Sequence, residues 1–565
     1  MMNEKFTVAA ASAIFAALLA INLSAASSVD LGLLESARAG TREQVRAALA
    51  AGANANERQP DGATALAWAV HRDDLEMADI LIGAGADLNA ANDYGIAPLS
   101  IACLNQNAGM VRKLAEAGAN ANSATWTGET PLMTCARIGL NDGVAALLNG
   151  NADVNAKDSR RGQTALMWAI AEGHPDIARL LIEKGADINA QSKMLDGFTP
   201  KIYKTYYGTL EISSRGGFTP LMFAASVGDL DSAKMLVARG ADVNHSTMED
   251  GNTMLLATAN GHEDVALFLL ESGADPNSKA GDGSDITALH YALRDGIKSL
   301  MESKGAGFFS QIVQQEQQST TKKEEAGPLD GANMPRLVKA LLAKGADSNA
   351  RMGLPPARLR KGGRAYVSVD GATPFLLAAA SGDVPSMRLL AESKADTRLG
   401  TKVNESEIPV GKNSDDAQFE GSATALLAAA GLGRSRDRRG PEAQRAFEAV
   451  KTLIEMGADV NQVNETGWTA LHAATYIGAD NIVQYLIEKG ARLDVQNGCG
   501  QTPLTLANGT NSRGLIQIPR ERKSTTDLLK KFGASETLSG GPVGRCVEGR
   551  YGIEYFTERD SKKKP

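Results

Sequence analysis

Cysteine and histidine are scarce in this sequence. Only four cysteines and six histidines occur among 565 residues, and no two cysteines form a Cys-x-x-Cys pair. The nearest two histidines, His245 and His262, are 17 residues apart. Zinc sites draw their ligands from short, fixed spacings. The sequence therefore lacks the common zinc-binding patterns, and we expect neither a metal nor another cofactor.

Catalytic motifs are missing as well. There is no phosphate-binding Gly-x-x-x-x-Gly-Lys loop and no Gly-x-Ser-x-Gly elbow. His262 and Glu263 begin like a zinc-protease helix, but Ala266 stands where that motif requires its second histidine. We interpret His262 as structural and predict that the protein is not an enzyme. An activity held in the insertions described below is the alternative.

Net positive charge and long apolar runs are absent from most of the chain. The formal net charge is −7, which argues against nucleic acid as a partner. One apolar run, from Phe6 to Val29, follows Lys5 and contains the small residues Ser24 to Ser27. It predicts a signal peptide over 1–26 and a periplasmic or extracellular location. An uncleaved membrane anchor or a buried helix are the alternatives; after cleavage no transmembrane span is expected.

A block reading Gly-Ala-Asp-(Val/Ile/Leu)-Asn recurs along the chain. Four consecutive asparagines that end such blocks, Asn56, Asn89, Asn122 and Asn155, are 33 residues apart. A fixed period of this length is typical of stacked supersecondary units that bury their apolar faces against one another. We therefore expect one elongated repeat body over 29–534 rather than several globular domains.

Residues 164–189 show the signals of a single unit. Thr164 can cap a first helix, Pro175 suits the first turn of a second helix, and Gly185 can end that helix in the left-handed conformation. The position of Gly185 recurs along the chain as Gly52, Gly85, Gly118, Asn151, Gly185, Gly240, Gly273, Gly345, Lys394, Gly457, Gly490 and Gly533. This predicts about twelve repeats, with Lys394 marking a strained or looser one.

The first helices of these units begin with related sequences. They read Thr130-Pro131-Leu132, Thr219-Pro220-Leu221, Thr469-Ala470-Leu471-His472 and Thr502-Pro503-Leu504. Together with the 33-residue period, these helix starts resemble those of the ankyrin-repeat family. We expect an exported, bacterial-type member of this family with several insertions. The resemblance implies an all-α repeat solenoid of stacked helix-turn-helix units, with projecting hairpins and a concave face. Such an array acts by binding other proteins.

The four cysteines are interpreted in two pairs. Cys103 and Cys135 lie on expected first helices, at positions where small residues recur, and we interpret both as packed, unreactive thiols. Cys499 lies in the last recognisable hairpin and Cys546 in the C-terminal tail. In an oxidising compartment these two could form a disulfide; two free thiols are the alternative.

Departures from the 33-residue period mark insertions. They fall near 193–216, 297–332, 351–369, 398–420, 433–441 and 509–523. The 297–332 insertion is rich in glutamine and lysine, which predicts a flexible loop with at most one short helix. Residues 535–565 form a tail that we expect to be partly disordered.

Several insertions are basic, whereas the repeat body is acidic. The insertion near 351–369 carries Arg358, Arg360, Lys361 and Arg364, with no acid between Arg351 and Arg364. Such loops can steer an acidic protein or an anionic polymer toward the molecule. Ordinary solvated loops are the alternative.

Aromatic residues make up only 5% of the chain, so their positions are informative. The insertion near 193–216 gathers Lys201, Tyr203, Lys204, Tyr206 and Tyr207. Tyrosine combines a large contact area with a polar tip, which favours partner binding, with a self-packed lid as the alternative.

The four tryptophans divide by their place in the repeat. Trp68 and Trp168 fall inside first helices and are expected to be packed. Trp126 and Trp468 fall beside turns and are contact candidates. Together these features predict an exported, monomeric ankyrin-repeat scaffold that binds another protein, an acidic one if the basic insertions take part. A protein that binds the cell envelope or an anionic polymer is the alternative.

Overall fold

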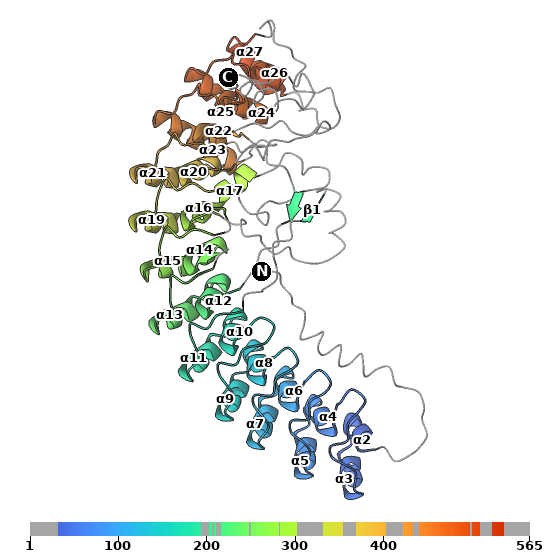
Figure 1. Ribbon diagram of the computed structural model, residues 1–565. Helices are drawn as coiled ribbons and strands as arrows, with labels where there is room; N and C mark the ends of the chain where they lie inside the picture. Colours follow the sequence, from blue (N-terminus) through green and yellow to red (C-terminus); the bar gives the residue numbers. More distant parts are fainter. Residues whose placement is uncertain are drawn as a thin grey trace, which may run out of the picture. The chain divides into compact units, whose positions relative to one another are not determined.

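The computed structural model describes residues 32–193, 203–205, 208–210, 216–247, 250–281, 283–301, 332–353, 369–402, 422–432, 440–497, 500–508 and 522–535 (Figure 1). The predicted signal peptide, most of each insertion and nearly all of the tail lie outside these ranges. The chain divides into two compact units, one within Met1–Gly197 and Arg215–Asp242, the other within Phe198–Ser214 and Val243–Pro565.

Unit 1 consists of short helices that follow one another in pairs (Figure 1). The first helices of its pairs are α2 (Leu33–Ala39), α4 (Ala65–His71), α6 (Pro98–Leu104), α8 (Pro131–Arg137), α10 (Ala165–Ala171) and α12 (Pro220–Val227). The second helices are α3 (Arg42–Ala50), α5 (Leu75–Gly83), α7 (Ala108–Glu116), α9 (Asn141–Asn149), α11 (Pro175–Glu183) and α13 (Leu230–Ala238). The predicted all-α repeat architecture is confirmed.

Unit 2 repeats this pattern with interruptions. Its helices are α14 (Thr253–Ala259), α15 (Glu263–Glu271), α16 (Ala288–Ala292), α17 (Arg294–Met301), α19 (Pro335–Ala343), α20 (Pro374–Ser381), α21 (Val384–Glu392), α22 (Ala425–Ala430), α23 (Pro441–Glu455), α24 (Ala470–Ile477), α25 (Asp480–Glu488), α26 (Pro503–Ala507) and α27 (Lys523–Lys531). Strand β1 (Tyr203–Thr205) pairs antiparallel with β2 (Gly208–Leu210), with Tyr203 opposite Leu210. Strand β3 (Ser246–Thr247) pairs antiparallel with β4 (Gly251–Asn252).

Local sequence signals explain why the first helices start where they do. The hydroxyl of Thr164 accepts a hydrogen bond from the amide of Met167 at 3.4 Å, which satisfies one of the amides without a helical partner. Leu166 follows and is fully buried, as is Leu181 on the second helix. Burial of a leucine side chain contributes about 1.5–3 kcal/mol, so each pair of helices is held mainly by its apolar stripe.

The end of a first helix is often capped by a side chain from the next repeat. Nη1 of Arg72 donates to the carbonyl oxygen of Arg38 at 3.2 Å, at the end of α2. Nδ2 of Asn105 donates to the carbonyl oxygen of His71 at 2.8 Å, at the end of α4. In the same way, Nε2 of His174 bonds to the carbonyl oxygen of Arg137, and Nη2 of Arg294 donates to the carbonyl oxygen of Thr258. The last carbonyls of a helix lack internal partners, so these contacts couple neighbouring repeats.

The recurring asparagine that sets the period joins consecutive hairpins. Nδ2 of Asn122 donates to the carbonyl oxygen of Asn151 at 3.1 Å, while its Oδ1 accepts from the amide of Asp153 at 2.7 Å. Asn56 makes the same two bonds to Gly85 and Asp87. The 33-residue spacing therefore reflects an amide side chain that bridges each hairpin to the next.

The residues that follow the second helices adopt the expected left-handed conformation. Gly185 has φ of +90°. Asn151 and Lys394, the two residues that replace glycine at this position, have φ of +61° and +64°. A side chain with a Cβ is strained there, and lysine more than asparagine, so the predicted strain at Lys394 is present in the backbone.

The largest insertion begins with ordered structure. Helix α17 packs against α20, and its Ile297 and Leu300 are buried. A Cβ at Gly296 would lie 2.1 Å from the carbonyl oxygen of Leu377, so the two helices can approach closely only because this residue is glycine. Residues 297–301 therefore form the end of α17, while residues 302–331 of the predicted loop lie outside the described residues. Burial of Ile297 and Leu300 against the next repeat orders this end of the segment.

Candidate interaction surface on the hairpin tips

The hairpins of unit 1 end in turns that are fixed by buried polar side chains. Oδ1 of Asn92 accepts hydrogen bonds from the amides of Tyr94 and Ile96 at 3.1 and 2.9 Å. Asp158 does the same for the amides of Arg160 and Arg161, at 3.0 and 2.6 Å. Such side chain to backbone bonds define the turn without help from a partner. The residues at the tips are therefore held in place in the free protein.

Backbone hydrogen bonds link each tip to the next. The amide of Asp93 donates to the carbonyl oxygen of Asp61 at 3.0 Å, and that of Trp126 to Tyr94 at 3.3 Å. The two remaining bonds run from Ser159 to Thr127 at 2.9 Å and from Lys193 to Arg161 at 2.7 Å. We call these eight residues the tip ladder.

Glycine makes this close approach of the tips possible. Gly128 has φ of +77°, and a Cβ on it would lie 2.5 Å from the amide nitrogen of Ser159. Gly162 has φ of +63°, and its Cβ would lie 2.7 Å from the amide nitrogen of Lys193. Both conformation and space therefore require glycine at these two turns.

Two large aromatic residues of the tip ladder are exposed. Trp126 is 78% exposed and Tyr94 is 43% exposed. Among the described residues, the other exposed large hydrophobic side chains are Leu75 and Val463. Tryptophan on a rigid turn is a typical anchor of protein interfaces. Trp126, a predicted contact residue, is thus exposed, and its role in binding stays a prediction.

Trp468, the second predicted contact residue, lies in the core of unit 2. Only 3% of it is exposed, and its ring contacts His472 and Tyr476, with ring centroids 6.0 and 5.9 Å apart. The prediction for Trp468 is wrong because its turn folds the ring inward over α24. Trp68 is buried as predicted, whereas Trp168 is half-buried; Arg38 and Arg137 lie over the two rings, each 5.6 Å from the ring centroid.

Most of the other predicted contact residues lie outside the described residues. This applies to Lys201, Tyr206, Tyr207, Arg358, Arg360, Lys361 and Arg364, and to Cys499 and Cys546 of the predicted disulfide. Tyr203 and Lys204 lie on β1, whose backbone alone is described. Their roles in binding stay predictions.

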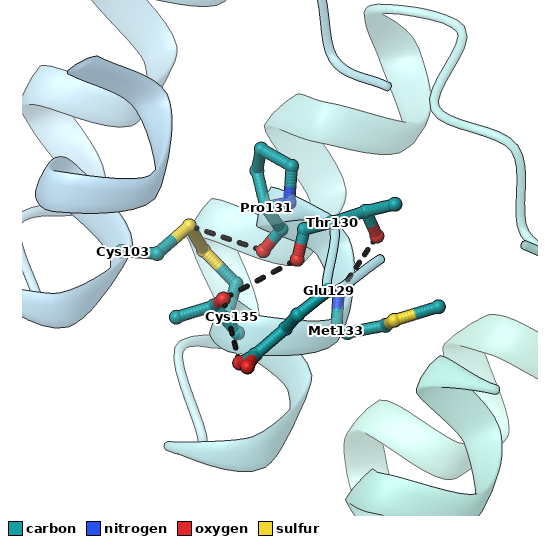
Figure 2. Close-up of a disulfide and its surroundings, with 7 residues drawn as sticks. Cys103, Glu129, Thr130, Pro131, Met133 and Cys135 are labelled. Atoms are coloured by element: carbon teal, nitrogen blue, oxygen red, sulfur yellow. Dashed lines mark hydrogen bonds between the residues drawn. A yellow bond between two sulfur atoms is a disulfide. The ribbon is translucent and has the colours of Figure 1, made fainter. Parts of the chain in front are cut away.

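Cys103 and Cys135 form a disulfide between α6 and α8, the first helices of consecutive repeats (Figure 2). Their Cα atoms are 5.0 Å apart, and both residues are fully buried. The Sγ atom of Cys103 also lies 3.3 Å from the carbonyl oxygen of Pro131. The prediction of two separate packed thiols is wrong. Both cysteines lie on first helices 32 residues apart, and this spacing, close to one repeat, was the available signal.

No group of three or more histidine, cysteine, aspartate or glutamate side chains in the described part of the chain is placed to hold a metal ion. None of the helices described here has the length and apolar character that a membrane span requires.

Comparisons with known proteins agree with the repeat architecture. A family model for ankyrin repeats, in three copies, matches residues 33–125, 120–192, 202–280 and 442–518, more than half of the chain. Human Rabankyrin-5 is 29% identical over 175 residues, which are 31% of this chain and 13% of that protein. The ankyrin repeat and SOCS box protein 16 of Mus musculus is 31% identical over 195 residues, which are 30% of this chain and 42% of that protein.

A third relative is the NF-kappa-B inhibitor cactus of Drosophila melanogaster. It is 27% identical over 172 residues, which are 28% of this chain and 34% of that protein. The matched region thus spans less than half the length of each of these relatives. All three come from animals, so a bacterial origin stays a prediction. The family match and the repeated helix pairs lead to one conclusion: the chain belongs to the ankyrin-repeat family.

Proposed function

We propose that this protein is an exported scaffold of about twelve ankyrin repeats that binds another protein through its hairpins and first helices. Ankyrin repeats generally act as protein-interaction modules. The name of one relative, an inhibitor of NF-kappa-B, describes a protein that acts on another protein. Binding, rather than catalysis, is also what the scarcity of catalytic motifs favours.

The observation that carries the proposal is the exposure of Trp126 on a rigid hairpin tip. Its indole is 78% exposed, although burial of an aromatic ring is favourable. The turn that holds it is closed by hydrogen bonds from the amide of Gly128 to the carbonyl oxygen of Thr125 at 2.8 Å and from the amide of Glu129 to the hydroxyl of Thr125 at 3.2 Å. Little ordering entropy is therefore lost when a partner covers the indole. An exposed, preorganised tryptophan therefore supports a binding function.

The proposed export is supported by two separate features. The disulfide between Cys103 and Cys135 favours an oxidising compartment, because thiols are kept reduced in the cytosol. The apolar run from Phe6 to Val29 has the composition of a signal peptide. We propose a periplasmic or extracellular protein, with an uncleaved anchor as the alternative.

A chemical crosslinking experiment in the native compartment tests the proposal. The intact protein is compared with Trp126→Ala and with a variant that lacks residues 197–214. We expect one stoichiometric polypeptide to crosslink to the intact protein, and at least one variant to lose it. If no polypeptide is crosslinked and the protein is instead retained on an anionic polysaccharide and eluted by salt, it is a polymer-binding protein.

A further inference from the structure

The side chains of the tip ladder change in chemical class in a regular order from one hairpin to the next. Each of the ladder's four backbone hydrogen bonds joins two residues whose side chains belong to the same chemical class. Asp61 is bonded to Asp93, Tyr94 to Trp126, Thr127 to Ser159, and Arg161 to Lys193. Along the stack the pairs therefore read acidic, aromatic, hydroxyl and basic.

Most side chains of the ladder are exposed to solvent. Asp93, Tyr94, Trp126, Ser159, Arg161 and Lys193 are exposed, whereas Asp61 and Thr127 are half-buried. The aromatic pair lies between the charged pairs, so it separates opposite charges along one edge of unit 1.

Neighbouring residues reinforce the basic end of the ladder. Arg160 is exposed beside Arg161, and Lys157 is exposed with its Nζ donating to the carbonyl oxygen of Gln191 at 3.0 Å. Asp158, the acid in this turn, is buried, and its carboxylate accepts from backbone amides. Its charge is therefore directed toward the turn rather than toward a partner.

The acidic end is reinforced less strongly. Glu57 is exposed in the first hairpin, and the neighbouring Arg58 turns its guanidinium to the carbonyl oxygen of Ala91. Asp61, Asp93 and Glu57 together outnumber the one cation, Arg58, so this end stays negative. A uniform polyanion would be attracted at one end of the ladder and repelled at the other.

The spacing of the repeats sets the register of a matching partner. Stacked helices lie about 8–10 Å apart, so the pairs of the ladder follow one another at about this distance. An extended chain advances about 3.3 Å per residue, or roughly three residues per pair. The acidic and basic pairs are three steps apart, which corresponds to about nine residues of an extended segment.

We propose that the tip ladder binds an extended segment of another protein with a basic side chain at one end, an apolar side chain about three residues further, and an acidic side chain about six residues beyond that. The basic residue lies against Asp61 and Asp93, the apolar one covers Tyr94 and Trp126, and the acidic one meets Arg161 and Lys193. This inference rests on the proposed function and specifies its partner.

Fluorescein-labelled peptides of about twelve residues test the inference by fluorescence anisotropy with the full-length protein. The first peptide has two lysines, a central leucine and phenylalanine, and two glutamates at this spacing. A second peptide has glutamates at both ends, and a third has glycine and serine at its centre. We expect the first peptide to bind, and each of the other two to bind with an affinity at least about tenfold lower.

Variants of the protein sharpen the comparison. Trp126→Ala is expected to weaken the first peptide about tenfold, without changing the unfolding midpoint, because the indole is mostly exposed. Asp93→Lys is expected to weaken the first peptide and to strengthen the one with glutamates at both ends. Glu116→Lys on α7, also exposed, makes the same charge change away from the ladder and is expected to alter neither affinity by more than about twofold.

The inference is overturned if the first peptide does not bind, if the doubly acidic peptide binds equally well, or if Trp126→Ala leaves the affinity unchanged. The crosslinking experiment separates these results from the broader proposal. A native polypeptide that still crosslinks to Trp126→Ala, but not to the variant lacking 197–214, would remove the tip ladder as its site. The protein-binding function would then remain.

Discussion

The disulfide between Cys103 and Cys135 joins two first helices that belong to consecutive repeats. It closes a segment with a sequence separation of 32 residues, which includes all of α7 and the hairpin that presents Trp126. The bond therefore ties together the two repeats on either side of the exposed tryptophan.

Removal of this bond is expected to destabilise unit 1. A closed loop of this length restricts the unfolded chain by about 3–4 kcal/mol. Cys103→Ala/Cys135→Ala, and the wild-type protein in reductant, should both unfold at lower urea concentration than the oxidised protein. The stability of unit 1 in the double variant should be insensitive to reductant, because Cys499 and Cys546 lie in unit 2. If a thiol reagent labels Cys103 and Cys135 in the unfolded, unreduced protein, the disulfide is absent.

Two buried histidines make the stability of unit 2 dependent on pH. Burial lowers the pKa of His290 and of His472 from 6.5 to about 4. Both lie in capping boxes, with Nδ1 of His472 2.8 Å from the hydroxyl of Thr469. As the pH falls below 6.5, the unfolded state binds protons before the folded state does, so stability is lost between pH 6.5 and about 4. Each histidine accounts for about 3 kcal/mol.

His472→Gln isolates one of these two contributions. Glutamine at this position can keep the capping box but does not titrate. Urea unfolding between pH 7.5 and 4 should show a smaller loss of stability for this variant than for the wild-type protein. An unchanged slope with pH would show that His472 does not carry the effect.

Lys394→Gly is expected to stabilise its repeat. Lys394 has φ of +64°, a conformation that glycine adopts without the steric cost of a Cβ. The gain is about 0.5–1 kcal/mol, because glycine also increases the entropy of the unfolded chain. Asn151→Gly, at the corresponding place in unit 1, should gain less, since asparagine tolerates φ of +61°. Equal or opposite effects on the urea midpoint would argue against strain at Lys394.

Asn122→Ala is expected to loosen two consecutive hairpins. The change removes the bonds to the carbonyl oxygen of Asn151 and from the amide of Asp153, at a cost of about 1–3 kcal/mol. Asn120→Asp is the matched control, because aspartate keeps the acceptor that bonds the amide of Asn122. Amide hydrogen exchange should rise around Asp153 in the first variant only. Unchanged protection of the amides around Asp153 would show that Asn122 does not couple the two hairpins.

The local features of the fold could be predicted from the sequence because they depend on a few adjacent residues. Thr164 caps α10, Pro175 opens α11, and Gly185 takes the left-handed conformation, as the spacing indicated. The candidate site was predicted less well. Trp126 and Trp468 both stand near turns in the sequence, yet one is exposed and the other is packed against α24.

The sequence by itself determined the ankyrin family, the helix pairs and their caps, because propensity, capping and the left-handed turn act within one repeat. Only the tertiary structure decided which residues of neighbouring repeats meet. The disulfide between Cys103 and Cys135, the bridging by Asn122 and the chemical order of the tip ladder all depend on how one repeat stacks on the next. That stacking is set by buried side chains and close backbone approach, as at Gly128, which a repeat period does not encode.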